Sequence, residues 1–294
     1  MARQKKSLLD ETREQLRRFD LRARKGLAQH FLTNRDVLQK IVTAAELSRD
    51  DTVLEVGPGL GILTGELVIQ AGRVIAVELD EKLAGLLKEQ MAVCTNLTIV
   101  NRDIMDVEPG ALIREIQPDS ASGDNIRYKV VANLPYYITS MLLRRFLEAS
   151  IKPGLMVIMV QKEIARQIIA PAGKMSVLSI SVQFYGKPQI IDYVPAECFY
   201  PAPKVDSAIL RIDIYPQPAL NIEDTDSFFR LVKAGFKANR KQLVNSLARG
   251  LELSKFDILP VLEKAGIDFT RRAETLTLDE WGKLYRTFTE MSKC

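Results

Sequence analysis

Short runs of β-branched and other apolar residues alternate with helix-like segments, and this alternation most constrains the fold of the chain. The first run reads DTVLEVG (51–57), and the segment GILTGELVIQAG follows shortly after it. Strands that are apolar throughout are typical of a parallel sheet covered by helices on both faces. The sequence therefore predicts an α/β fold. The other runs of this kind are 72–80, 96–103, 127–133 and 155–161.

Two later runs, 176–186 and 205–215, also read as strands, and no long helix fits between them. An antiparallel pairing at the end of the sheet accommodates both runs, so the sequence predicts a mixed sheet. Beyond the Pro-rich segment YPQP (215–218), apolar residues recur every three to four positions, which is typical of helices.

These patterns divide the chain into three parts. We expect a basic N-terminal extension over residues 1–24. The α/β domain is expected over 25–214, and a small helical domain over 215–294.

Composition argues against several classes of site. The 294 residues include one histidine and three widely spaced cysteines, with no C-x-x-C spacing. We therefore expect neither a metal site nor a disulfide framework, which indicates a reducing, cytoplasmic compartment. The N-terminus lacks the apolar stretch of a signal peptide, and no apolar run approaches the ~20 residues of a membrane-spanning helix. We expect no association with a membrane.

Basic residues concentrate in two zones of a chain whose net charge is only +4. Residues 1–29 contain nine basic and four acidic side chains, and residues 230–250 contain six basic and no acidic ones. Such zones favour a polyanionic partner such as a nucleic acid, although a solvated basic surface explains them equally well.

The segment EVGPGLG (55–61) lies where the first predicted strand meets the first helix. Glycines at 57, 59 and 61 permit a tight turn and a close approach of the backbone to a ligand. The next two strands end in Glu78 and Asp103. A carboxylate at the first tip can accept both hydroxyls of a ribose, and one at the second can accept the exocyclic amine of adenine. Helix capping is the alternative role for each acid.

No basic cluster accompanies the glycines, so a pyrophosphate has no charged partner there. A helix N-terminus alone can bind phosphate, so this argues only weakly against NAD. It fits better a nucleoside without phosphate, such as S-adenosylmethionine.

The fourth strand ends in NLPY (133–136), an unusual end for a buried strand. Asn133 Oδ1 and the Leu134 carbonyl could each accept one N–H of an aromatic amine and orient its lone pair. Pro135 stiffens the loop, and Tyr136 offers a flat face on which a base can stack. The alternative is an ordinary turn, which Asn and Pro both favour.

A base that is removed from its stack needs a second aromatic partner. Phe199, in the Pro-stiffened loop ECFYPAPKVDS, is the candidate, with Lys204 on a basic rim that would contact RNA. A buried phenylalanine in a crossover loop is the alternative.

Several segments, taken in order, match the motifs of one family. The sequence resembles the ribosomal small-subunit RNA adenine dimethyltransferases, the KsgA family, from about Arg24 to the C-terminal helices. The matching segments are AQHFL (28–32), EVGPGLGILT (55–64), VELD (77–80), NRD (101–103), NLPYYIT (133–139), FYPAPKVDS (199–207) and FKANRKQL (236–243).

The resemblance implies an S-adenosylmethionine-dependent methyltransferase with a Rossmann-like catalytic domain. It implies that the enzyme dimethylates N6 of two adjacent adenines in the 3′-terminal hairpin loop of 16S rRNA, within the immature small ribosomal subunit. We expect it to act as a monomer. The residues implied to bind the cofactor are His30, Leu32, Gly57, Glu78, Asp103 and Asn133. The residues implied to hold the target base are Asn133, Tyr136 and Phe199, to which the chemistry of the strand end adds the Leu134 carbonyl.

Two positions depart from the family pattern. Ala28 stands where the family usually has glycine, and Tyr137 where many members have asparagine. The extension before residue 24 lies outside the pattern and reads as a basic RNA-contacting arm or a disordered tail.

Two other functions remain open. One is a large-subunit adenine methyltransferase of the erythromycin-resistance type, and the other is a non-catalytic assembly or transcription factor on the same scaffold. The segment RLVKAGFKANRKQL adds a predicted RNA-binding face. Its basic residues at helical spacing are Lys233, Lys237, Arg240 and Lys241.

Overall fold

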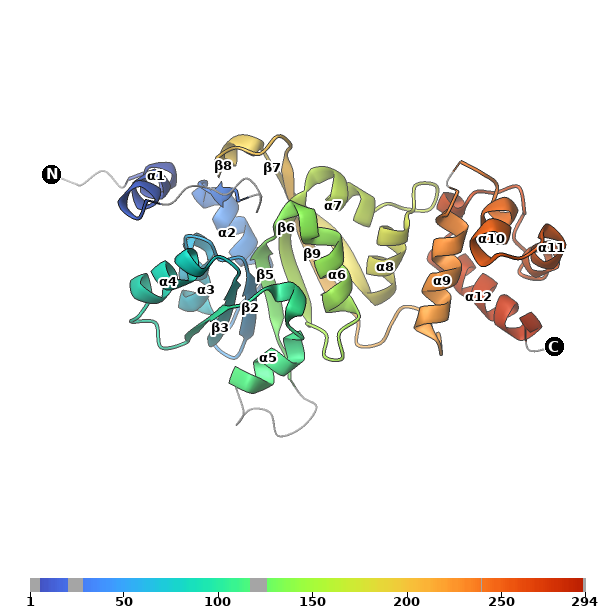
Figure 1. Ribbon diagram of the computed structural model, residues 1–294, viewed down its shortest axis with the longest axis horizontal. Coiled ribbons are helices and arrows are strands. Elements are labelled where there is room, and N and C mark those ends of the chain that lie inside the picture. Colours follow the sequence, from blue (N-terminus) through green and yellow to red (C-terminus); the bar gives the residue numbers. More distant parts are fainter. Residues whose placement is uncertain (1–5, 21–28, 117–125, 239, 293–294) are drawn as a thin grey trace. The chain divides into compact units, whose positions relative to one another are not determined.

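The structure, a computed structural model (Figure 1), divides into two compact units. Unit 1 comprises Met1–Ala165 and Gln189–Ile214, and unit 2 comprises Arg166–Pro188 and Tyr215–Cys294. Unit 2 thus includes a segment, 166–188, that the sequence assigned to the α/β domain. The residues that the structure describes are 6–20, 29–116, 126–238 and 240–292.

A seven-stranded sheet forms the centre of unit 1 (Figure 1). In spatial order its strands are β4 (Leu97–Asn101), β3 (Arg73–Glu78), β2 (Thr52–Val56), β5 (Lys129–Asn133), β6 (Leu155–Gln161), β9 (Ser207–Ile214) and β7 (Gly186–Val194). The strands from β4 to β6 run parallel, and β9 runs antiparallel to β6. This topology confirms the predicted mixed sheet.

The central strands are buried on both faces. Val53 and Leu54 of β2 are both 0% exposed, although successive side chains of a strand point to opposite faces. On one face, Val53 and Val131 belong to a core cluster with Ile41 of α2 and Leu67 of α3. Coverage of both faces explains why the strands are apolar throughout. The helices of unit 1 are α1 (Leu8–Arg18), α2 (Arg35–Ala44), α3 (Ile62–Gln70), α4 (Glu81–Gln90), α5 (Pro109–Ile116) and α6 (Thr139–Leu147).

The prediction of a strand over 176–186 is wrong, because these residues form the helix α8 (Val177–Tyr185). The Ser176 hydroxyl accepts the Ser179 N–H, and the Ser179 hydroxyl accepts the Ser176 N–H. This capping box satisfies two backbone donors of the first turn and favours a helix despite the β-branched content. The edge strand is instead β7, which contains Pro188, as edge strands tolerate proline.

Unit 2 is helical, as predicted for the C-terminal part. Its helices are α8, α9 (Thr225–Phe236), α10 (Leu243–Leu251), α11 (Lys255–Lys264) and α12 (Leu278–Ser292), and α7 (Lys162–Ile168) crosses the boundary between the units. Aromatic rings fill the core: the Phe184 and Phe228 rings stack with centroids 5.3 Å apart, and Trp281 is fully buried. Within the described ranges, no helix combines the length and apolar character needed to cross a membrane.

The basic residues predicted to share one helix face in unit 2 do not share it. Helix α9, which carries Lys233, ends with Lys237 as its C-cap, and Arg240 and Lys241 lie in the turn before α10. The Lys241 N–H donates to the Ala238 carbonyl and closes this turn. The break allows α9 and α10 to pack against each other, which one continuous helix could not do. All four basic side chains are exposed.

Candidate active site

Strand β2 passes into α3 through a glycine turn. Gly57, Gly59 and Gly61 have φ values of 66°, 59° and 79°, a region of backbone conformation that favours glycine. A Cβ atom at Gly59 would lie 3.1 Å from the Phe31 ring, so the turn passes close to that ring. Gly61 is the N-cap of α3 and makes no side-chain capping bond. The turn therefore leaves a strand tip and a helix N-terminus open to a ligand.

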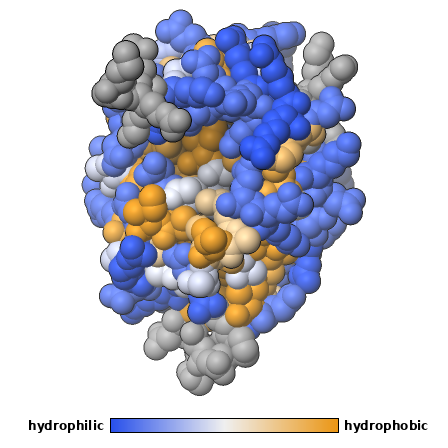
Figure 2. All heavy atoms as spheres, turned by 90° about the vertical axis from the view of Figure 1, so that its left-hand side faces the viewer, coloured by the Kyte–Doolittle hydropathy of each residue, from blue (hydrophilic) through white to orange (hydrophobic). Residues whose placement is uncertain are grey.

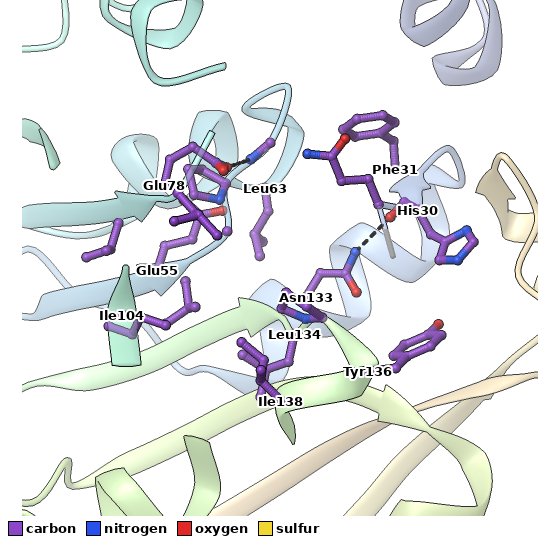
Figure 3. Close-up of a pocket in the computed structure, with 18 of the residues that line it drawn as sticks. His30, Phe31, Glu55, Leu63, Glu78, Ile104, Asn133, Leu134, Tyr136 and Ile138 are labelled. Carbon is purple, nitrogen blue, oxygen red and sulfur yellow. Dashed lines mark hydrogen bonds between the residues drawn. The ribbon is translucent and has the colours of Figure 1, made fainter. Parts of the chain in front are cut away.

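Glu78, the last residue of β3, holds the glycine turn. Its Oε2 accepts the Gly59 N–H at 3.0 Å, and its Oε1 accepts the Asp80 N–H at 2.8 Å (Figure 3). The side chain is 5% exposed, and this burial raises the pKa of Glu78 above its ordinary value. Each carboxylate oxygen keeps a second lone pair. Glu78 could therefore accept two ribose hydroxyls while it still holds the turn.

A second carboxyl group, Glu55 of β2, lines the same pocket (Figure 3). It is 1% exposed, and burial raises the pKa of Glu55 to about 8, with the nearby Glu78 charge acting in the same direction. The Thr64 hydroxyl offsets part of this effect. Within the described residues, neither that hydroxyl nor Glu55 Oε2 makes a hydrogen bond of normal geometry. Glu55 is therefore mostly protonated at pH 7, which avoids two adjacent buried charges.

We expect Glu55→Gln to change how the free energy of unfolding depends on pH. Between pH 4.5 and about 8, Glu55 loses its proton in the unfolded chain but keeps it in the folded protein. As the pH rises through this window, the free energy of unfolding of the wild-type protein should therefore fall by up to about 1.4 kcal/mol per pH unit relative to that of the variant. Above about pH 8 the difference between the two proteins should stay constant. Urea unfolding of both proteins at pH 5.5, 7 and 8.5 measures the difference. A difference that is constant with pH would show that Glu55 is ionised in the folded protein.

Asp103 follows β4 at the neighbouring strand tip. The register pairs Glu78 with Asn101, whose Nδ2 donates to the Glu78 carbonyl at 2.8 Å and ties the two tips together. Asp103 Oδ1 accepts the Met105 N–H at 2.8 Å and caps a short 3₁₀ helix, Ile104–Asp106. The capping role considered from the sequence thus exists. The other carboxylate lone pairs could still accept an adenine amine.

Asn133, at the tip of β5, has a fixed amide orientation. Its Nδ2 donates to the His30 carbonyl at 3.1 Å (Figure 3). Because a carbonyl oxygen can only accept, the nitrogen must face His30. The Asn133 oxygen therefore points away from that carbonyl, and Figure 3 shows it on the side of Tyr136. Asn133 Oδ1 therefore offers the pocket a hydrogen-bond acceptor of the carbonyl type.

The Tyr136 ring is held from two sides. Its hydroxyl lies 2.5 Å from Ser207 Oγ, and burial raises the pKa of Tyr136 above its ordinary value. The His30 and Tyr136 rings stack, with centroids 6.0 Å apart and planes inclined by 23°. His30 Nδ1 lies 2.7 Å from the Pro201 carbonyl and must carry the proton of that bond. The Tyr136 ring therefore keeps one orientation beside Asn133.

The structure places most of the predicted site residues in one pocket. It is formed at the carboxyl ends of the parallel strands, where ligands of open α/β sheets bind. Leu134 is 1% exposed, and its N–H donates to the Met159 carbonyl, which fixes the backbone beside Asn133. Acceptors suited to a nucleoside and to an amine therefore share one cavity. The predicted residues that line it are His30, Leu32, Gly57, Glu78, Asp103, Asn133, Leu134 and Tyr136.

Phe199 does not line this pocket in the structure. It pairs with Leu32 in a two-stranded sheet formed by β1 (Phe31–Leu32) and β8 (Phe199–Tyr200). The ring is 3% exposed and belongs to the core cluster beneath α2. The structure therefore matches the alternative of a buried phenylalanine. Stacking of Phe199 on a base stays a prediction that requires the β8 segment to move.

Several pocket residues were not singled out from the sequence, among them Phe31, Glu55, Leu63 and Ile104 (Figure 3). Each lies inside or next to a motif that was identified, so adjacency was the available signal. Three of these side chains are apolar, and Glu55 lies within a predicted buried strand. From the sequence, all four positions are therefore expected in the hydrophobic core. Only the tertiary structure turns them toward the cavity.

The remaining predicted positions lie elsewhere. Lys204 is exposed in unit 1, and the other four predicted RNA-binding residues belong to unit 2. Ala28 lies outside the described residues. Residues 8–18 of the N-terminal extension are not a disordered tail, because they form α1. Leu16 of α1 packs with Phe31 near the glycine turn, and contact of this extension with RNA stays a prediction.

Known proteins of one family are similar to this chain over nearly its whole length. The family model "Ribosomal RNA adenine dimethylase" matches residues 20–289. A relative from Dehalococcoides mccartyi, named ribosomal RNA small subunit methyltransferase A, is 50% identical over 97% of this chain and 94% of its own length. One of the same name from Alkaliphilus oremlandii is 40% identical over 93% and 94%.

Two solved structures resemble the chain over most of its length. A dimethyladenosine transferase from Plasmodium falciparum has a TM-score of 0.72 and 25% identity, covering 90% of this chain and 98% of its own. The 23S rRNA methyltransferase ErmE has a TM-score of 0.68 and 28% identity, covering 88% and 99%. The match over residues 20–289, with relatives up to 50% identical, establishes that this chain is a methyltransferase of the ribosomal RNA adenine dimethylase family.

Proposed function

We propose that the protein dimethylates N6 of two adjacent adenines in the 3′-terminal hairpin loop of 16S rRNA, with S-adenosylmethionine as methyl donor. One observation carries the proposal: the His30 carbonyl orients the Asn133 amide so that Oδ1 faces the pocket beside Tyr136. An acceptor fixed in this way suits a substrate that brings N–H donors. Relatives named ribosomal RNA small subunit methyltransferase A support the choice of rRNA.

The residues present fit the cofactor. Glu78 would accept the two ribose hydroxyls, and Asp103 would accept the adenine amine of the cofactor. The methionine end would lie beside Gly57 of the glycine turn and would be bordered by His30 and Leu32, all of which line the pocket. S-adenosylmethionine supplies an activated methyl group on a sulfonium sulfur.

The protein has to activate a poor nucleophile. The lone pair of an adenine amine is delocalised into the ring, and the neutral amine is too weak an acid for a carboxylate base to help. Asn133 Oδ1 and the Leu134 carbonyl would accept its two N–H groups and turn the lone pair toward the methyl group. The same oxygens would stabilise positive charge on the nitrogen as the N–C bond forms and the bond between the methyl group and the sulfonium sulfur breaks, which would leave a neutral thioether. The nitrogen then loses one proton to water.

The Tyr136 ring would support the target base. Its position is fixed by Ser207 and His30 before any substrate binds, so little conformational freedom is lost on stacking. Base–aromatic stacking contributes about 1–3 kcal/mol per base. This is comparable to the cost of removing a base from its own stack.

The substrate is the immature small ribosomal subunit, on which we expect the protein to act as a cytoplasmic monomer. The similarity to ErmE makes a large-subunit adenine the second candidate. Greater identity to the small-subunit relatives favours the first.

One assay separates these functions. Small and large subunits from cells that lack both modifications are incubated with radiolabelled S-adenosylmethionine, and the products are mapped with nuclease. We expect label in two adjacent adenines of 16S rRNA, with four methyl groups at completion. Label in 23S rRNA would select the second candidate, and no transfer to either subunit would contradict the proposal.

The exposed basic turn of unit 2 provides a prediction about RNA binding. Lys241→Glu should weaken binding to the small subunit about threefold to tenfold and lower the salt slope of log K by about 1, because a phosphate contact is lost. Lys255→Glu is the matched control, since Lys255 is also exposed in unit 2 and the charge change is the same. Filter binding between 50 and 200 mM salt measures the affinity and the salt slope of both variants. Equal effects of the two variants would show that only net charge matters.

A further inference from the structure

Tyr137 is an exposed aromatic residue on the rim of the active-site pocket. It lines the same cavity as Tyr136, yet its side chain is 52% exposed, whereas Tyr136 is partly buried and bonded to Ser207. Met141, four residues further along the chain, is 51% exposed. A large aromatic ring in this position adds little to the core, because half of it remains in water.

The backbone that carries Tyr137 is fixed. The residue lies in the 3₁₀ helix Tyr136–Ile138, in which the Ile138 N–H donates to the Pro135 carbonyl at 3.2 Å. The Thr139 hydroxyl donates to the same carbonyl at 3.3 Å. A 3₁₀ helix has three residues per turn, so successive side chains point about 120° apart. The rings of Tyr136 and Tyr137 therefore cannot face the same base.

Two aromatic residues in sequence thus offer two separate faces at one pocket, one toward Asn133 and one toward solvent. Figure 2 shows one face of the protein, on which hydrophobic residues form a patch surrounded by hydrophilic residues. An exposed aromatic ring next to a site for an unpaired base is the arrangement that single-stranded nucleic acids use for stacking. A neighbouring base of the same strand has the flat face that such an exposed ring can stack on.

We propose that Tyr137 is the stacking platform for the nucleotide next to the target adenine, and that it selects substrates in which this neighbour is unpaired. The inference rests on the proposed function and extends it to a second subsite. Because the two accepting adenines are adjacent, one of them would occupy the Tyr137 platform while the other is in the pocket. Tyr137 is a specificity residue and takes no part in methyl transfer itself.

The test combines a protein change with a substrate change. Small subunits are reconstituted with 16S rRNA that has a single accepting adenine. One substrate carries an abasic site immediately 5′ of this adenine, and a second carries the abasic site immediately 3′ of it. For each substrate, kcat/KM is measured for the first methyl transfer. With intact RNA, Tyr137→Ala should lower kcat/KM about 5- to 100-fold, mostly through KM, and Tyr137→Phe should retain it. With one of the two abasic substrates, wild-type and Tyr137→Ala should become equal.

Controls separate stacking from damage to the fold. Tyr137→Ala should keep cofactor affinity within twofold, as measured by calorimetry without RNA. Phe269→Ala, which removes a ring that is 50% exposed in unit 2, should not interact with either abasic site. If the effects of Tyr137→Ala and of both abasic sites simply multiply, or if Tyr137→Ala is as active as wild type, the platform is refuted. If wild type fails to methylate intact particles, the proposed function fails, and the second subsite with it.

Discussion

Asn133→Ala is expected to lower methyl transfer to 16S rRNA about 10²- to 10³-fold. In the proposed mechanism the amide oxygen would act on charge that develops in the transition state, and removal of one such preorganised group typically costs this much in kcat. The variant also loses the bond from Nδ2 to the His30 carbonyl, which is 3.1 Å long. The proposed cofactor contacts through Glu78 and Asp103 should be unaffected. We therefore expect a loss in kcat with particle binding retained.

Single-turnover transfer and filter binding on the same particles measure the two quantities separately. Asn96→Ala is the matched control, because Asn96 Nδ2 donates to the Val68 and Ala71 carbonyls in a purely structural role. It should lose stability but not turnover per folded molecule. An Asn133→Ala variant with a normal single-turnover rate would disprove the role given to the amide.

Glu78→Ala is expected to weaken S-adenosylmethionine binding by about 10²-fold or more. The variant would lack the carboxylate that accepts two hydrogen bonds from the ribose hydroxyls, and hydrogen bonds to charged groups contribute about 1.5–3 kcal/mol each. The glycine turn would also lose the acceptor for the Gly59 N–H at 3.0 Å. Glu78→Gln should be nearly as weak. Its amide nitrogen must face either the Gly59 or the Asp80 N–H, and both of these groups are donors.

Calorimetric titration with the cofactor, without RNA, measures the affinity directly. Glu81→Ala removes an exposed carboxylate three residues away and is the control for a general loss of negative charge. Thermal unfolding of each variant shows whether the protein is folded. Cofactor affinity within threefold of wild type in Glu78→Ala would show that the ribose lies elsewhere.

The sheet and the position of the pocket could be predicted because both depend on local sequence. A run such as residues 127–133 is apolar throughout, and only a strand covered on both faces buries such a run completely. Parallel strands place their carboxyl ends at one edge, so Glu78 and Asn133 had to meet there. The glycine turn added a position where other residues would be strained.

Prediction from local sequence failed where a cap or a distant partner competed with the local preference. Residues 177–185 are rich in β-branched side chains, yet the Ser176–Ser179 capping box and the aromatic core of unit 2 favour a helix. Phe199 reads as a loop aromatic, but pairing with Leu32 buries it. In each case the deciding contact comes from a cap or from a partner distant in sequence.

The sequence by itself determined the mixed α/β sheet, the helical C-terminal part and the chemical groups at the strand tips, because burial patterns and turn residues act over a few positions. Only the tertiary structure decided how those groups are oriented and charged. The Asn133 amide is turned by a carbonyl 103 positions away, and Glu55 keeps its proton because neighbouring strands and Glu78 surround it. Hydrogen-bond direction and desolvation depend on the complete set of neighbours, which exists only in the folded chain.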